Sequence, residues 1–181
     1  MTGLSTHVGN LSTLGLLPER QFLHYAWPCL DNRAGHGQQV SKVHIAELME
    51  LIRGRGRPRR SLLRYVFPDA YRGIGQAAKI LRMDRWTQAA VERYFLFDHD
   101  MHLNTALANG IPRQVVDLCR ILVGRVVSLA PLQCQLSLGE DSRRYSLNPL
   151  KLPCQLGAYV AVHGLTVVDV LKLPDFREDA G

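Results

Sequence analysis

The pattern of hydrophobic and polar positions changes its period once along the chain. From Pro18 to about Leu118, apolar residues recur at intervals of three and four, which is typical of amphipathic helices. Beyond Leu118 the period falls to two, and residues 132–138 alternate strictly between apolar and polar side chains, as in a half-buried β-strand. The sequence therefore predicts a helical half followed by a β-rich half.

Start and stop signals divide the helical half into five or six helices. Proline suits the first turn of a helix, and a serine or an aspartate can cap the helix that follows it. The predicted starts or breaks are Pro18, Ser41, Pro58, Pro68, Asp84 and Pro112. We expect these helices to form an all-α bundle with a modest core.

The β-rich half is short. The alternating residues 132–138 and a return strand through Tyr145 and Leu147 flank a hairpin turn, and residues 121–129 and 159–171 supply further strands rich in valine. Several short strands in so small a region avoid open edges by closing into a barrel. The predicted fold class is therefore α+β with segregated halves: a helical bundle, then a small OB-like β-barrel.

These signals also predict the domain organisation. We expect a flexible leader over residues 1–17, a helical domain over 18–117, a β-barrel over 118–173 and a tail over 174–181. The leader has no Lys or Arg before its apolar stretch, which is not typical of a signal peptide. No apolar run approaches the roughly 20 residues that span a bilayer. A cytoplasmic protein without a membrane partner is expected.

Composition and cysteine spacing limit the class of protein and the kinds of cysteine site that the sequence predicts. Hydrophobic residues make up 46% of the chain and charged residues 21%, which indicates an ordinary globular protein with a net charge of +6. The four cysteines are well separated and include no C-x-x-C pair, so neither a disulfide framework nor a common zinc motif is predicted. Cys134, on the apolar face of an alternating strand, is predicted to lie in the core. Nothing resembles a nucleotide-binding or hydrolase motif.

Two segments of the β-rich half carry a resemblance to a known family. Residues 119–127 read Cys-Arg-Ile-Leu-Val-Gly-Arg-Val-Val, and residues 157–164 read Gly-Ala-Tyr-Val-Ala-Val-His-Gly. In this order and at this separation, the segments resemble the first and last strands of the HypC/HupF family of hydrogenase-maturation chaperones. Cys119 and His163 match the functional positions of that family. Cys119 lies inside the chain, whereas the family's cysteine directly follows the initiator methionine.

The resemblance implies a function. Members of the family bind iron that carries cyanide and carbon monoxide, and they hand it to the large subunit of a nickel–iron hydrogenase. We therefore expect an accessory protein rather than an enzyme. It would hold iron as an Fe(CN)2CO fragment on Cys119 and His163, and its partners would be the hydrogenase large subunit and other maturation proteins. A thiolate and an imidazole suit such iron. The alternative interpretation of Cys119 is a small buried hydrophobe.

Three further features leave alternatives open. Cys29 follows a proline at a helix end and could form a second metal or thiol site, or it could anchor a loop. His99 and His102 share a helical face and could both reach a metal, although a polar helix end is the favoured interpretation because no Glu or Asp is placed as in the known helical zinc motifs. A basic segment follows the second predicted helix and contains Arg53, Arg55, Arg57, Arg59 and Arg60.

The basic segment raises a different function. Its Arg-Gly-Arg-Pro core, residues 55–58, is similar to an AT-hook, whose arginines enter the minor groove of A·T-rich DNA. A single copy held between two helices favours a solvated basic loop, and we do not expect a nucleic-acid partner. A DNA-binding regulator, and a protein-interaction module without metal, are the alternatives to the maturation function.

Overall fold

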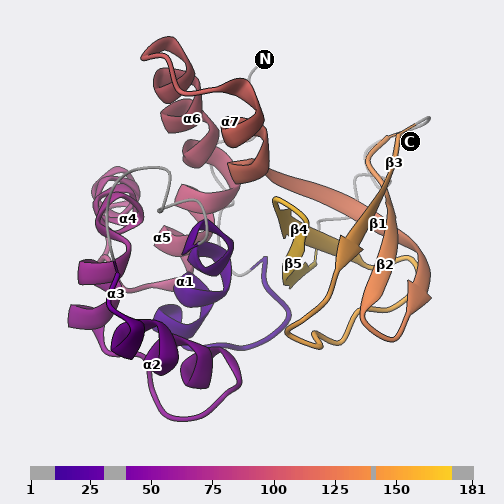
Figure 1. Cartoon of the computed structure of the whole chain (residues 1–181), viewed down its shortest axis with the longest axis horizontal. Coiled ribbons are helices and arrows are strands. Elements are labelled where there is room, and N and C mark those ends of the chain that lie inside the picture. The colour runs from indigo at the N-terminus through magenta and orange to yellow at the C-terminus, as the bar shows by residue number, and fades with distance from the viewer. Residues whose placement is uncertain (1–10, 31–39, 140–141, 173–181) are drawn as a thin grey trace.

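The computed structural model describes residues 11–30, 40–139 and 142–172 (Figure 1). Residues 1–10 of the predicted leader and the predicted tail, 174–181, lie outside the described residues. The helical elements are α1 (Pro18–Ala26), α2 (Lys42–Ile52), α3 (Arg60–Val66), α4 (Pro68–Leu81), α5 (Gln88–Arg93), the π-helical η2 (Tyr94–Asp98), α6 (His99–Ala108) and α7 (Arg113–Cys119). The strands are β1 (Ile121–Ala130), β2 (Gln133–Ser137), β3 (Arg143–Leu147), β4 (Tyr159–His163) and β5 (Thr166–Leu171). The α+β class, with helices preceding a sheet, is confirmed.

Most of the predicted helix starts are observed. Proline occupies the first turn of α1 and of α4, and the Ser41 side chain accepts a hydrogen bond from the backbone N–H of His44 to cap α2. The predicted cap at Asp84 is wrong. Helix α5 begins later, at Gln88, because the Thr87 hydroxyl accepts the hydrogen bond from Ala90 N. No described helix has the length and apolar character needed to cross a membrane.

The five strands form one sheet whose order closes on itself, β1-β2-β3-β5-β4. Strand β1 is antiparallel to both β2 and β4, with Ile121 opposite His163 at one end. The circle is completed by a single parallel pair between Leu147 of β3 and Thr166 of β5. Cys134 and the interior-facing valines of β4 pack inside this sheet, which confirms the prediction for Cys134.

The helices and the sheet share a hydrophobic core. Ala161 of β4 and Val168 and Leu171 of β5 belong to the cluster formed by the helices, while Val160 and Val162 of β4 belong to the cluster inside the sheet. Figure 1 shows β4 and β5 on the side of the sheet that faces the helices. The predicted boundary at residues 117–118 falls within α7. The two halves are thus packed against each other along β4 and β5.

The described part of the predicted leader is bound to the sheet. Thr13 N donates to Val170 O at 2.8 Å, and Lys172 N donates to Leu11 O at 2.7 Å, so residues 11–13 extend the edge of β5. The buried Glu92 carboxylate also accepts hydrogen bonds from the backbone N–H groups of Leu11 and Ser12. The expectation of a flexible leader is therefore wrong for these residues, because their backbone groups find partners on β5 and α5.

Candidate metal centre

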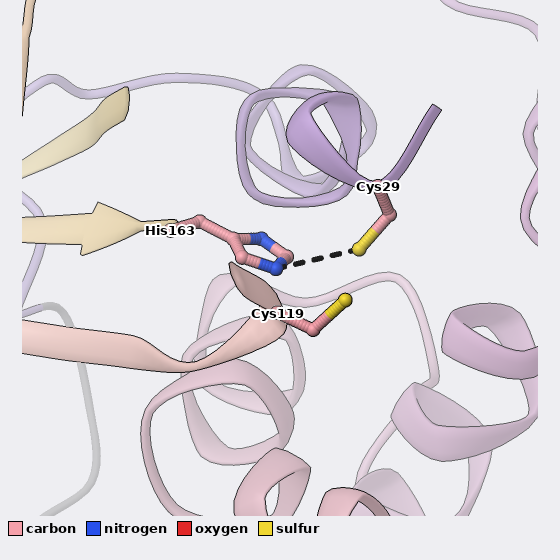
Figure 2. Close-up of side chains that lie close together, drawn as sticks. All are labelled: Cys29, Cys119 and His163. Atoms are coloured by element: carbon pink, nitrogen blue, oxygen red, sulfur yellow. Dashed lines mark hydrogen bonds between the residues drawn. The ribbon is translucent and has the colours of Figure 1, made fainter. Parts of the chain in front are cut away.

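Three side chains from distant parts of the chain meet where the helices contact the sheet (Figure 2). They are Cys29, Cys119 and His163, and their ligand atoms all lie within 4.8 Å of one another. Cys29 comes from the 3₁₀ turn at residues 27–30 that follows α1, Cys119 ends α7, and His163 ends β4. The structure thus brings together the two residues of the family resemblance and the additional cysteine.

The end of α7 and the end of β4 are held together by a backbone contact beside the site. Gly164 N donates to Arg120 O at 3.1 Å. Gly164 has φ +59°, and a Cβ atom on it would lie 2.6 Å from the carbonyl oxygen of Leu118. Only glycine adopts this conformation at low cost and permits so close an approach. Gly164 therefore fixes Cys119 beside His163.

His163 has a defined partner on each ring nitrogen. Its Nδ1 lies 2.6 Å from the backbone carbonyl oxygen of Tyr25, and its Nε2 lies 3.3 Å from Cys29 Sγ. A carbonyl only accepts, so we assign the ring proton to Nδ1, which leaves the Nε2 lone pair facing the sulfur atoms. Metal-bound histidines are commonly oriented in this way by a backbone carbonyl.

The burial of His163 results from the helices rather than from the sheet. Strand alternation predicts that Ala161 and His163 point away from the sheet interior, where Val160 and Val162 lie. The clusters around β4 agree with that alternation, yet His163 is fully buried. Helix α1 covers it, and the carbonyl group of Tyr25 satisfies its polar nitrogen. The imidazole therefore lies in a low-dielectric environment.

A cavity of about 520 Å³ adjoins the two cysteines. Cys29 and Cys119 form part of its wall, and Tyr94, His99 and His102 line it from η2 and α6. Burial, followed by the neighbouring Cys29, raises the pKa of the Tyr94 phenol well above its usual range. The cavity gives a metal ion at the three-residue group a face that is not covered by its protein ligands.

The two histidines of α6 differ in their surroundings. His99 is buried, and its ring makes an edge-to-face contact with that of His163 at a centroid distance of 5.4 Å. Burial lowers the pKa of His99 to about 3, and the neighbouring imidazoles of His163 and His102 add to this effect. His102 is exposed and packs against Tyr94. His99 thus lies next to the three-residue group without belonging to it, whereas the side chain of His102 is exposed.

A buried polar network behind the site was not predicted. The Gln21 amide donates to Glu92 at 3.1 Å and to Asp169 at 3.2 Å, and the Ser12 hydroxyl donates to Asp169 at 2.7 Å. Burial raises the pKa of Asp169 to about 6, although the hydrogen bonds from Ser12 and Gln21 act in the opposite direction. The phenol of Tyr25 faces this carboxyl. One signal was present in the sequence, because Asp169 interrupts an otherwise apolar valine-rich strand.

The network supports the metal centre through Tyr25. The side chain of this residue faces the carboxyl groups of Asp169 and Glu92, and its backbone carbonyl accepts from His163. Tyr25 also stacks on Phe95 at a centroid distance of 5.0 Å. These contacts restrict α1 at the point where it orients the imidazole.

The arginines of the basic segment are paired with glutamates of α1 and α2. Glu50 accepts from Arg53 and Arg55 at 2.7 and 2.6 Å, and Glu47 accepts from Arg59 at 2.8 Å. The buried Glu19 pairs with Arg60 at 2.7 Å and lies 3.8 Å from Arg57. The segment is thus held against the bundle, while its arginine side chains remain largely exposed to solvent.

Comparison of the chain with protein-family models, with curated proteins and with solved structures gives no match. The class of site is defined by its own geometry: two thiols and one imidazole around a common point, with a cavity on one side. This donor set suits zinc, iron and copper better than magnesium or calcium.

Proposed function

We propose that this protein is an accessory factor of nickel–iron hydrogenase maturation that carries the Fe(CN)2CO fragment on Cys119, His163 and Cys29. The observation that supports it best is the convergence of their ligand atoms within 4.8 Å. Cys119 and His163 belong to the two segments that resemble the chaperone family, and they lie at opposite ends of that resemblance. Their convergence is the relationship that a shared metal requires.

The number of ligands favours a carrier over a structural site. Structural zinc sites are usually closed by four protein ligands, whereas this group has three among the described residues. The adjoining cavity leaves room for small ligands on the metal that do not come from the protein. Thiolate ligands on a metal can be replaced by other ligands, and a factor that releases its metal cargo needs such exchange.

The proposed site differs from that of the chaperone family through Cys29. In the family that the β-rich half resembles, the cysteine follows the initiator methionine and carries a free amino group. Cys119 has a peptide nitrogen instead, and the helical half contributes the thiol of Cys29 near the same point. We propose that Cys29 supplies the additional donor, and that the helices provide the surface that meets the hydrogenase large subunit.

The test is anaerobic purification after co-expression with the full maturation machinery, followed by infrared spectroscopy. We expect cyanide and carbonyl stretching bands and bound iron, with both lost in Cys119→Ala and strongly reduced in Cys29→Ala. Cys154→Ala is the matched control, because Cys154 lies outside the site and should leave the bands unchanged. If the wild-type protein carries no bands under these conditions, the carrier function is wrong.

Thiol chemistry is a second candidate, favoured by the 3.3 Å distance between Cys29 Sγ and His163 Nε2. An imidazole that accepts the thiol proton can produce a nucleophilic thiolate. Alkylation of the metal-free protein by iodoacetamide at neutral pH separates the candidates. Rapid, selective modification of Cys29 that is lost in His163→Gln, without any metal binding, would favour catalysis over metal carriage.

A further inference from the structure

One face of the sheet takes no part in the metal centre. Figure 1 shows β2 on the side of the sheet away from the helices. Cys134 and Leu136 of β2 point into the core inside the sheet, so their neighbours along the strand point outward. The cross-strand register continues this outward set onto β1, β3 and the start of β4. We define this outer face by Arg125, Gln135, Ser137, Arg143, Tyr145 and Tyr159.

Aromatic and basic side chains lie side by side on the outer face. Tyr159 is opposite Arg125, and Arg125 is opposite Ser137. Arg143 is the next partner of Ser137, so one row crosses four strands over roughly 14 Å. Tyr145 lies two residues along β3 from Arg143 and points to the same side. Because Tyr145 is 62% exposed and Tyr159 is 38% exposed, both rings are offered to solvent beside guanidinium groups.

The charge on this half of the protein has one sign at the surface. Among the described residues from 121 to 172, the basic side chains are exposed or half-buried, whereas the one acidic residue, Asp169, is buried. The acidic residues 140–141 lie outside the described part of the chain. Arg125 donates to the backbone carbonyl of Gly157 at 3.3 Å, a contact that positions the guanidinium without neutralising it. The outer face therefore suits an anionic partner.

We propose that the outer face binds single-stranded RNA. Unpaired bases stack on Tyr145 and Tyr159, and the two arginines contact phosphates, which is the combination that single strands require. Bases within a duplex are stacked on one another and offer no free ring face to a tyrosine. Gln135 and Ser137, between the tyrosines, provide donors and acceptors for the ribose 2′-hydroxyl, which DNA lacks. Their polarity also differs from the apolar centre of most protein interfaces.

The outer face lies apart from the metal centre and from the basic segment. His163 is opposite Ile121 at one end of the β1–β4 pair, whereas Tyr159 is opposite Arg125 at the other end. The basic segment belongs to the helical half, and its arginines are paired with glutamates. RNA binding at the outer face therefore does not depend on a metal, and it gives the protein a nucleic-acid partner that the basic segment does not predict.

The experiment measures the fluorescence anisotropy of a labelled oligouridylate of about 12 nucleotides, titrated with the full chain at several salt concentrations. Tyr145→Leu keeps the net charge and removes a stacking ring, and it should weaken binding about fivefold or more. Arg143→Gln should weaken binding and reduce the slope of log affinity against log salt by about 0.7, the value expected for one phosphate contact on a single strand.

Two matched controls separate the outer face from general attraction to a basic protein. Tyr65→Leu removes a tyrosine of α3 that is 58% exposed, close to the exposure of Tyr145. Arg113→Gln removes one positive charge from an exposed side chain of α7. Both variants should bind the oligouridylate as the wild type does, with an unchanged salt slope.

Three competitors complete the test: an oligothymidylate and an RNA duplex of the same length, and a decaglutamate peptide. Each should compete more weakly than unlabelled oligouridylate. Equal competition by the oligothymidylate would overturn the assignment to RNA, and equal competition by the duplex or the peptide would reduce the outer face to a non-specific basic surface. Unchanged affinity in Tyr145→Leu, or an equal loss in Tyr65→Leu, would show that the site is wrong. None of these results alters the test of the metal centre.

Discussion

His163 Nδ1 lies 2.6 Å from the backbone carbonyl oxygen of Tyr25, a contact between the end of β4 and the end of α1. A backbone carbonyl cannot be lost by substitution and has no proton to give. The contact therefore fixes both the orientation of the imidazole and the nitrogen that carries the proton. It leaves Nε2, 3.3 Å from Cys29 Sγ, as the nitrogen available to a metal.

This relationship predicts the tautomer of His163. Long-range ¹H–¹⁵N correlation spectra of the metal-free protein should show a protonated, slowly exchanging Nδ1 and an unprotonated Nε2. Addition of Zn(II) should move the Nε2 resonance and leave Nδ1 protonated, because only Nε2 faces the sulfur atoms. A proton on Nε2 in the metal-free protein, with Nδ1 unprotonated, would contradict the assignment. His44, half-buried on α2, provides an internal reference that should not respond to Zn(II).

A second prediction concerns Gly164. A Cβ atom there would meet the Leu118 carbonyl at 2.6 Å, and φ is +59°, so Gly164→Ala must shift the end of α7. The left-handed conformation alone costs about 1–2 kcal/mol for a residue with a side chain. We expect Gly164→Ala to lower the free energy of unfolding by more than this and to weaken metal binding, because Cys119 moves with α7.

Gly110→Ala is the matched control for that substitution. Gly110 also has a positive φ, +88°, but no atom of the described residues lies within 4 Å of the position of its Cβ. The free energy of unfolding of Gly110→Ala should fall only by the cost of the left-handed conformation, and the metal affinity of this variant should equal that of the wild type. Urea denaturation and titration against a competing chelator measure the two effects. Equal losses of stability in the two variants would show that the Leu118 contact does not matter.

The third prediction concerns the pH dependence of stability through Asp169. Burial raises its pKa from 3.8 in the unfolded chain to about 6 in the folded protein. The folded state therefore binds more protons than the unfolded state between these values, and this carboxyl makes the protein less stable as pH rises from about 4 to about 6. The effect is on the order of 3 kcal/mol and is constant above that range.

Asp169→Asn removes this titration. The free energy of unfolding of the variant minus that of the wild type should increase from pH 4 to pH 6 and then level off, as measured by urea denaturation at several pH values. Comparing the two proteins cancels the opposite effect of His24, whose pKa is lowered to about 4 chiefly by burial and which destabilises the fold in acid. Parallel pH profiles would show that Asp169 titrates normally in the folded protein.

The fourth prediction concerns the basic segment. Its arginines are paired with Glu19, Glu47 and Glu50, and these carboxylates reduce the positive charge that the segment offers to DNA phosphates. We expect A·T-rich duplex to bind only at the non-specific level, with Kd on the order of 10⁻⁴–10⁻⁶ M at physiological salt. Electrophoretic shift measures this.

Two substitutions sharpen the DNA measurement. Glu50→Gln removes the partner of both Arg53 and Arg55 and should raise the affinity for DNA. Replacing Arg55 and Arg57 with glutamine should change the wild-type affinity little. Tight, salt-sensitive binding that disappears with those two arginines would favour the DNA-binding regulator over the maturation factor.

The sequence by itself determined the features that depend on near neighbours. Helix starts at Pro18 and Pro68 and the cap at Ser41 follow from backbone geometry within one turn. The alternation around Cys134 follows from the two-residue period of a strand. These patterns predicted the α+β class and the order of its parts. The sequence also singled out Cys119 and His163 separately, through the segments that resemble the chaperone family.

Only the tertiary structure decided which of these residues meet. Cys29 and His163 are 134 positions apart, and no local pattern relates them. The packing of α1 on β4 and β5 brings them together, covers His163, and leaves Cys29 beside Cys119. The same packing buries Glu92 and Asp169 and binds residues 11–13 to β5. Such contacts depend on how two hydrophobic faces fit each other, which periodicity along one chain does not specify.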